Sequence, residues 1–332
     1  MKFWLVCFIF IAQNLFAFTL QEKFDQAEPG SYIVTEQNEL VSLLHLHSKK
    51  DHRFLFEEVS IPLHQSKKID WADWIKKGAI GHTSWILYEV DTQKKCVTEC
   101  YSLTRKAWIP TDEMDAFLIP LISLELDFLS EENRLQKGAT ARPGTISSQP
   151  WGPPQVRNGK KVKDPQYDVY TAKWPHDSSD LSGKQIVLYF DKNEEQFPFP
   201  YWLQARDGAL KFKMRAIDSG TGLSSPCTDI PRRKISFSNA PHKENGNLYL
   251  TLSAPTYYDN LQLFAIDLTA EPKTTHVLSF EQKRKKERLS LLIDEKKLDQ
   301  VFTKGHEYLW IISPEDSEFT IESPHTYVHC GS

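Results

Sequence analysis

The stretch YIVTEQNELVSLLHLHSKKDHRFLFEEVSI, residues 32–61, decides the fold. Apolar and polar residues alternate along it, and polar clusters interrupt the alternation. A period of two is typical of strands that bury one face, and short polar interruptions are typical of turns. The pattern therefore predicts a mainly β protein that begins as an antiparallel β-meander. Strands are expected at Tyr32–Glu36, Leu40–His47, Phe54–Ile61, Trp85–Val90, Val97–Thr104 and Leu124–Phe128.

Two short helices are expected to interrupt this sheet. Asp70 can cap the sequence WADWIKK, and Gly78 follows where the end of a helix favours a left-handed residue. A second helix should begin at Thr111, because Asp112 then places an acid in its first turn. Pro120 should end or kink that helix.

Residues 137–166 contain five prolines and four glycines and show no periodicity. This composition is typical of a linker, so we expect a boundary here between an antiparallel β domain with short helices (18–136) and a second region (167–332). In the second region strands recur roughly every 12 residues. Asp207-Gly208 predicts a tight hairpin. The region therefore reads as a sandwich of immunoglobulin-like or fibronectin-like architecture, although the Cys…Trp…Cys pattern of antibody domains is missing.

The first 17 residues, MKFWLVCFIFIAQNLFA, have the pattern of a signal peptide. Lys2 precedes the apolar run Phe3–Ala12, and Ala17 offers a small residue for cleavage. A bilayer span needs about 20 apolar residues, and this run is shorter. We therefore expect an exported protein, secreted or periplasmic, with an uncleaved signal anchor as the alternative.

Charge and cysteine content limit the function classes less sharply. The formal net charge of −4 argues against a nucleic-acid partner, because binding to phosphates needs a basic face. Cys96 directly precedes a predicted strand and Cys100 lies in it, so extended backbone would put them about 13 Å apart, which is too far for a disulfide. Two pairings among the cysteines after the signal peptide remain open, as does the fully reduced state. These cysteines are Cys96, Cys100, Cys227 and Cys330.

The sequence AIDSGT, residues 216–221, has the shape of an aspartic-protease loop. That chemistry needs two carboxylates that share a proton, and the chain holds one such motif. Asp-Ser-Gly is also common in turns. We therefore interpret Asp218 as a turn residue. His82 and Ser84 share a predicted strand face but have no acid to orient them.

The sequence LLHLHSKKDHRF, residues 43–54, brings three histidines around a predicted turn. His45 and His47 share one face of a strand. If 48–51 forms the loop, His47 lies opposite His52, and opposed Cβ atoms are about 5 Å apart. Three imidazoles at that spacing could bind zinc. The simpler interpretation is a polar strand face, because a one-residue change of register scatters the cluster. Candidates for a fourth ligand are Glu58 and His64.

An aromatic group follows in the sequence DKNEEQFPFPYWLQ. If exposed, its rings would form a platform for sugars or for a partner protein. The alternative is that the rings pack into the core at the end of a sheet. The residues are Phe197, Phe199, Tyr201 and Trp202.

The segments GHTSWILYEVD (81–91), LSGKQIVLYF (181–190) and FPYWLQ (199–204) resemble uncharacterised exported proteins of chlamydia-related bacteria. The resemblance implies a bacterial envelope or host-facing location. It carries no known activity, and so it assigns no catalytic residues.

The leading hypothesis from the sequence is an exported, non-enzymatic binding protein of the bacterial envelope or extracellular space. Its ligand would be a protein or a glycan. The alternative is a secreted hydrolase that depends on a metal bound by His45, His47 and His52. The chain has no Walker loop, dinucleotide fingerprint or HExxH motif to favour an enzyme.

Overall fold

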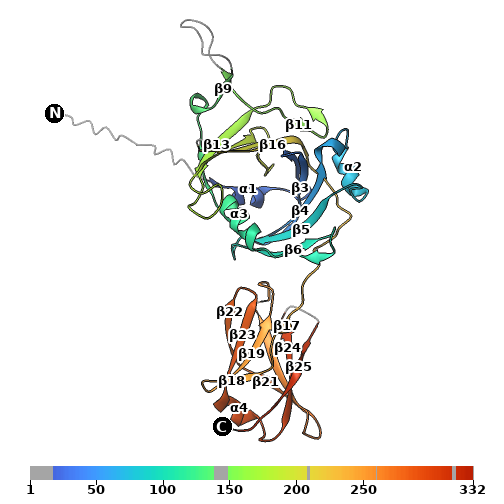
Figure 1. Ribbon diagram of the computed structural model, residues 1–332, viewed down its shortest axis with the longest axis vertical. Helices are drawn as coiled ribbons and strands as arrows, with labels where there is room; N and C mark the ends of the chain where they lie inside the picture. Colours follow the sequence, from blue (N-terminus) through green and yellow to red (C-terminus); the bar gives the residue numbers. More distant parts are fainter. Residues whose placement is uncertain (1–17, 138–148, 208–209, 259, 316–318, 332) are drawn as a thin grey trace, which may run out of the picture. The chain divides into compact units, whose positions relative to one another are not determined.

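The computed structural model shows a mainly β protein, as expected, with several antiparallel sheets (Figure 1). It describes residues 18–331 except 138–148, 208–209, 259 and 316–318. The predicted signal peptide, residues 1–17, lies outside the described residues. The chain divides into two compact units, Met1–Ile230 and Pro231–Ser332.

The first unit is built on one twelve-stranded sheet whose neighbouring strands are antiparallel. The strand order is β1-β8-β13-β14-β15-β16-β2-β3-β4-β5-β6-β7. The chain thus runs through β2–β6 as a meander. It later returns through β13–β16, and the last of these strands, β16, pairs with β2. The strands are β1 (Phe18–Thr19), β2 (Tyr32–Gln37), β3 (Leu40–Lys50), β4 (Arg53–Pro62), β5 (Ser84–Asp91), β6 (Cys96–Ser102), β7 (Ala107–Trp108), β8 (Glu125–Phe128), β13 (Tyr167–Lys173), β14 (Gln185–Asp191), β15 (Trp202–Asp207) and β16 (Leu210–Gly220).

The consecutive pairing of β2 to β6 confirms the predicted meander. The largest difference is in β3, which continues to Lys50. A bulge between Leu46 and Ser48 lets the polar end of β3 go on pairing with β4. The turn between the two strands is therefore shorter than the predicted loop.

Helices lie on both sides of this sheet. Figure 1 shows α1 and α3 on the concave side of the curved sheet and α2 on its outer side. Asp70 caps α2 as expected, since its side chain accepts a hydrogen bond from the backbone N–H of Asp73 at 3.1 Å. Helix α3 continues for two residues beyond Pro120. The helical elements are α1 (Leu20–Gln26), α2 (Trp71–Lys76), α3 (Asp112–Ile122) and the short turns η1 (Leu63–Gln65) and η2 (Glu131–Asn133).

Alternation along the strands gives the sheet two buried faces, because successive side chains point to opposite sides. The concave face packs on α1 and α3, and its core includes Ile33, Phe56 and Leu188. The outer face packs on α2 and on residues 221–230, which we call the covering segment. Its core includes Val34, Leu43, Val59, Ile75 and Leu223.

The predicted domain boundary at 137–166 is wrong. Strand β8 precedes this segment and β13 follows it, yet the two pair within the same sheet. The described part of the segment after residue 148 also packs on that unit, because the backbone N–H of Gly159 donates to Asp218. In that part, proline and glycine therefore mark irregular backbone within one unit. Two small hairpins lie in or beside the segment: β9 (Gln136–Lys137) with β10 (Gln149–Pro150), and β11 (Val156–Arg157) with β12 (Lys160–Lys161).

The second unit consists of two antiparallel sheets with a shared core, so a sandwich is confirmed for 231–332. Residues 167–220, predicted to belong to it, are part of the first sheet instead. The core combines Leu250 and Leu291 of one sheet with Leu263 and Trp310 of the other. One sheet contains β17 (Ser236–Phe237), β18 (His242–Glu244), β19 (Asn247–Ser253), β22 (Glu281–Lys285) and β23 (Arg288–Asp294). The other contains β20 (Leu261–Asp267), β21 (Thr274–Leu278), β24 (Glu307–Pro314) and β25 (Ile321–Val328), and α4 (Glu295–Val301) follows β23.

Two findings bear on the wider predictions. In the described part of the chain, no helix combines the length and apolarity that crossing a membrane requires. No cysteine pair there forms a disulfide.

Candidate functional site

The concave face of the first sheet does not pack completely against its helices. A cavity of about 460 Å³ remains between the sheet, α1 and α3. Its wall is mainly apolar, and it is formed by residues far apart in the sequence. Representative lining residues are Phe24, Leu44, Phe56, Leu118, Leu121 and Met214.

Helix α1 closes part of this cavity with an aromatic cluster. Its first turn is capped by Thr19, and Leu20 and Phe24 are buried. The ring of Phe24 lies 5.2 Å from that of Phe56 and 5.5 Å from that of Phe199. Edge-to-face contacts of this kind fix the position of the helix over the sheet.

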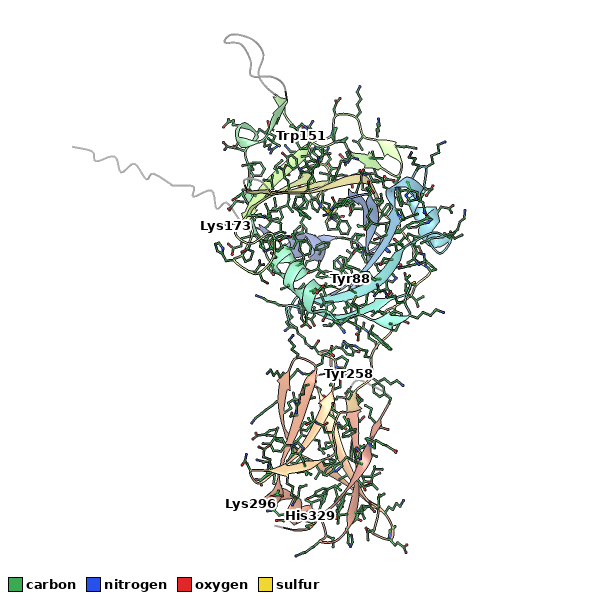
Figure 2. All side chains as sticks on the ribbon, viewed as in Figure 1. Tyr88, Trp151, Lys173, Tyr258, Lys296 and His329 are labelled. Carbon is green, nitrogen blue, oxygen red and sulfur yellow. The ribbon has the colours of Figure 1, made fainter. Side chains whose placement is uncertain are left out.

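Polar side chains gather on the inner face of β2, β3 and β4. Thr35 pairs with Ser42, which pairs with Ser60, and the two serine hydroxyls lie 2.8 Å apart. Glu58 follows on the same face of β4 and lines the cavity. Tyr88 on β5, labelled in Figure 2, also lines the cavity. The cavity thus has an apolar body and one polar wall.

The electrostatics of that wall centre on Glu58. Burial raises the pKa of its carboxyl group, and the hydrogen bond with Ser42 offsets this in part. Burial, together with the nearby Glu58, raises the pKa of the Tyr88 hydroxyl well above its usual range. A carboxyl with a raised pKa is more often neutral, and a neutral carboxyl can donate a hydrogen bond as well as accept one.

A second, more polar pocket of about 620 Å³ adjoins the cavity and shares four lining residues with it. Charged side chains of both signs line this pocket, including Glu36, Asp180 and Lys213. The charged side chains of this pocket and the apolar side chains of the cavity would together orient a ligand that has one polar end. The shared residues are Gln37, Asn38, Phe117 and Phe212.

On the outer face of the same sheet, Glu57 is the centre of a buried hydrogen-bond network. Its carboxylate accepts a hydrogen bond from Trp85 at 2.8 Å and one from Ser225 at 2.6 Å, and it lies 2.9 Å from Nδ1 of His45. Burial alone would raise the pKa of Glu57, but these hydrogen bonds hold it below its ordinary value. Nearby, Nε2 of His47 lies 2.7 Å from the carbonyl oxygen of Cys227. We call these residues, His45, His47, Glu57, Trp85, Ser225 and Cys227, the outer network.

The predicted three-histidine shell is wrong, because the register differs. His45 pairs with Glu57, and Lys50 pairs with Arg53, so His52 lies in a two-residue turn and is exposed. The proposed fourth ligands are also elsewhere: Glu58 faces the cavity and His64 is exposed. Within the described ranges, no group of three or more His, Cys, Asp and Glu residues is placed to hold a metal.

The predicted aromatic platform is wrong as well. Phe197, Phe199, Tyr201 and Trp202 are at most 7% exposed. Trp202 lies on β15 and contacts Trp151, with ring centroids 5.0 Å apart, and the other three lie just before that strand; all four belong to one buried apolar cluster. Phe199 contributes to the cavity wall instead.

Asp218 is not in a turn, because β16 continues to Gly220. It follows a bulge and accepts hydrogen bonds from the backbone N–H groups of Gly159 and Ser219. Its role is therefore to hold the β11–β12 hairpin against the sheet. The side chain of His82 lies 2.9 Å from the carbonyl oxygen of Ala79, which accounts for that residue structurally.

Sequence reasoning missed the cavity and the place of Glu58 in it. The available signal was the pair Glu57-Glu58 inside an apolar strand. Because successive side chains of a strand point to opposite faces, one of the two carboxylates must lie on each buried face. Two adjacent acids in such a strand therefore predict an unusual environment for at least one of them.

Comparisons with known proteins agree with the resemblance stated above. The model of the CT021 protein family matches residues 42–163, which is less than half of the chain. The 2.0 Å structure of the hypothetical protein CT021 from Chlamydia trachomatis is 19% identical, with a TM-score of 0.45. It aligns over 65% of this chain and 98% of its own. No curated protein sequence matches. The resemblance to uncharacterised chlamydial proteins is therefore confirmed.

Proposed function

We propose that the chain is an exported, non-enzymatic binding protein whose first unit holds a small apolar molecule with one polar head. The observation that carries this proposal is the cavity of about 460 Å³ on the concave face of the sheet. Ligand sites commonly have volumes of about 300–1,000 Å³, an apolar lining and a few convergent polar groups. The cavity has all three properties. Export rests on the sequence of residues 1–17.

The polar wall favours a particular kind of head group. Glu58 is the one acid among the described residues that line the cavity, and its raised pKa favours the neutral form. An alcohol or a protonated carboxylic acid can exchange hydrogen bonds with a neutral carboxyl and with Ser42. A permanently anionic head would meet a partly ionised carboxyl in a low dielectric, which is unfavourable. A long-chain alcohol is therefore the simplest model ligand.

Binding fits this geometry better than hydrolysis does. General acid–base chemistry uses two titratable groups whose pKa values are separated by their surroundings. Among the described residues that line the cavity, Glu58 and Tyr88 are the titratable ones, and burial raises the pKa of both, so their surroundings do not separate an acid from a base. The aromatic residues expected to form a surface platform are buried, and the ligand site that we propose is the interior cavity.

Dye displacement on the full chain tests the proposal. N-phenyl-1-naphthylamine, an apolar fluorescent probe, should bind and should be displaced by dodecanol. Leu44→Trp places an indole in the cavity, and we expect at least a tenfold loss of probe affinity, about 1.4 kcal/mol. Val277→Trp, on the second unit and 72% exposed in the native chain, is the matched control and should bind as the native protein does.

The result is decisive only for folded variants, so the thermal transition of each is recorded in parallel. Equal probe affinity in the native protein and in a folded Leu44→Trp variant would show that the cavity is not the binding site. Saturable binding that dodecanol cannot displace would reject the proposed ligand class.

A further inference from the structure

The second pocket, which we call the polar pocket, offers space for a head group beside the apolar cavity. Its volume is about 620 Å³. Gln37, the last residue of β2, and Asn38, which follows it, line both spaces, and both residues are exposed. A ligand that fills the cavity can therefore extend past these two amides into the polar pocket.

The polar wall of the cavity leads to this pocket. Ser42 is a hydrogen-bond partner of Glu58, and it pairs with Thr35 on the neighbouring strand. Gln37 follows Thr35 by two residues, so it lies on the same face of β2, about 7 Å farther along. All four residues line the cavity. A head group with several linked polar atoms therefore fits this wall better than a single hydroxyl does.

The lining of the polar pocket mixes hydrogen-bond donors with acceptors. The carboxylates of Glu36 and Asp180 accept hydrogen bonds, the ammonium group of Lys213 donates them, and the amides of Gln37 and Asn38 do both. A hydroxyl group also donates and accepts. A head group with many hydroxyls, such as a sugar, can therefore pair with each kind of group in this lining.

Two aromatic rings add an apolar surface to the polar pocket. They belong to Phe117, which is 36% exposed, and to Phe212, which is half-buried. The face of an aromatic ring carries partial negative charge, which attracts the partly positive C–H groups of a sugar ring. Rings beside hydrogen-bonding groups are therefore suited to a sugar, which has C–H faces and a rim of hydroxyls.

The charges of the polar pocket disfavour an anionic head group. Two of the three cationic side chains among its described lining residues already have an acceptor. Arg215 lies 2.5 Å from the carboxylate of Glu36, and the ammonium group of Lys184 donates to the backbone carbonyl of Asp180. A phosphate in this pocket would also meet the carboxylates of Glu36 and Asp180, and like charges repel.

We propose that the first unit binds an amphiphile with a glycosyl head group, with the sugar in the polar pocket and the alkyl chain in the cavity. This inference rests on the proposed function, because the cavity must hold the chain. It names the head group that the alcohol of the model ligand represents. The site also differs from the surface platform expected from the sequence, whose rings are buried.

Displacement of N-phenyl-1-naphthylamine from the full chain by four compounds with the same dodecyl chain tests the head group. They are dodecyl maltoside, dodecanol, octaethylene glycol monododecyl ether and dodecyl phosphate, each used below the concentration at which it aggregates. Dodecyl maltoside should displace the probe at a concentration at least tenfold lower than any of the others. A smaller difference would show that the protein does not select a sugar, and greater potency of dodecyl phosphate would show an anion site. Either result would overturn the inference.

Asp180→Ala locates the sugar. Asp180 is exposed, and it lines the polar pocket but is not among the described residues that line the cavity. In this variant the ratio between the potencies of dodecyl maltoside and dodecanol should fall at least fivefold. Glu28→Ala is the matched control, because Glu28 is another exposed acid of the first unit and is not among the described lining residues of either pocket. It should keep the native ratio.

The outcomes separate this inference from the proposed function. An unchanged ratio in a folded Asp180→Ala variant, or equal falls in both variants, would overturn the inference while the cavity remained a binding site. Failure of the native chain to bind the probe would overturn the proposed function and this inference together. The thermal transition of each variant shows whether it is folded.

Discussion

Glu57 and Glu58 are neighbours on β4, yet they lie in opposite environments. Glu57 points to the outer face, where two side chains donate to its carboxylate and His45 contacts it. Glu58 points to the concave face, where it lines an apolar cavity and Ser42 is the hydrogen-bond partner that affects its pKa. The same residue type thus belongs to a hydrogen-bonded network on one side and to an open site on the other.

The difference shows that the balance between burial and hydrogen bonds sets the direction in which the pKa of each carboxyl group shifts. Burial raises the pKa of both carboxyl groups. At Glu57 the hydrogen bonds outweigh burial and the pKa falls, whereas at Glu58 burial prevails and the pKa rises. On the outer face, the hydrogen bonds to Glu57 favour its ionised form. The concave face keeps a carboxyl that can exchange hydrogen bonds with a ligand.

The largest expected effect is the loss of the outer charge. Glu57→Leu leaves the donors of His45, Trp85 and Ser225 without their acceptor in the interior. Removing one partner of a buried, hydrogen-bonded network costs about 3–5 kcal/mol. We expect that loss in the free energy of unfolding of the first unit, measured by urea denaturation.

Glu58→Leu is the matched control for that experiment, one residue along the same strand. It replaces the acid of the polar wall with an apolar side chain that faces the apolar body of the cavity, and it removes a group with a raised pKa, so stability should change by less than about 1 kcal/mol. If both variants were destabilised equally, the contrast between the two faces would be wrong.

A smaller effect should appear in the pH dependence of stability. The folded-state pKa of Glu58 lies above its ordinary value of 4.5, so the folded chain keeps this proton longer than the unfolded chain. The contribution of Glu58 to the free energy of unfolding is therefore complete at pH values below 4.5, and it is lost as the pH rises through the folded-state pKa. One proton limits the slope to about 1.4 kcal/mol per pH unit.

Glu58→Gln isolates this contribution, because the amide keeps the shape but does not titrate. The difference in unfolding free energy between the native chain and the variant should move in favour of the variant as the pH rises above 4.5. A difference that stays constant between pH 4 and 8 would show that Glu58 titrates normally in the folded state.

The fold of the first sheet was largely predictable because its information is local. The alternation of apolar and polar residues predicted the strands of the meander, and Asp70 predicted the start of α2. The domain boundary was not predictable by the same means. The pairing of β8 with β13 joins residues on opposite sides of a proline-rich segment, and composition carries no information about such long-range pairing.

The candidate site was less predictable than the fold. A cavity is the space left between elements, so it depends on how α1 and α3 rest on the sheet and not on any motif. The histidines were identified, but a bulge after Leu46 changed the register and placed His52 in the turn. Predicting their partners would have required the path of the covering segment, which supplies Ser225 and Cys227.

The smallest expected effects concern the helix caps on the two faces. Asp70→Ala removes the cap of α2, which covers the outer face, and should cost about 1 kcal/mol. Thr19→Ala removes the longer, 3.3 Å cap of α1 and should cost less.

Because α1 lines the cavity and α2 does not, Thr19→Ala should weaken binding of N-phenyl-1-naphthylamine, whereas Asp70→Ala should leave it unchanged. Equal losses of probe affinity would mean that a disturbance of either helix reaches both faces through the sheet, so that the outer network and the cavity could not be treated as separate sites.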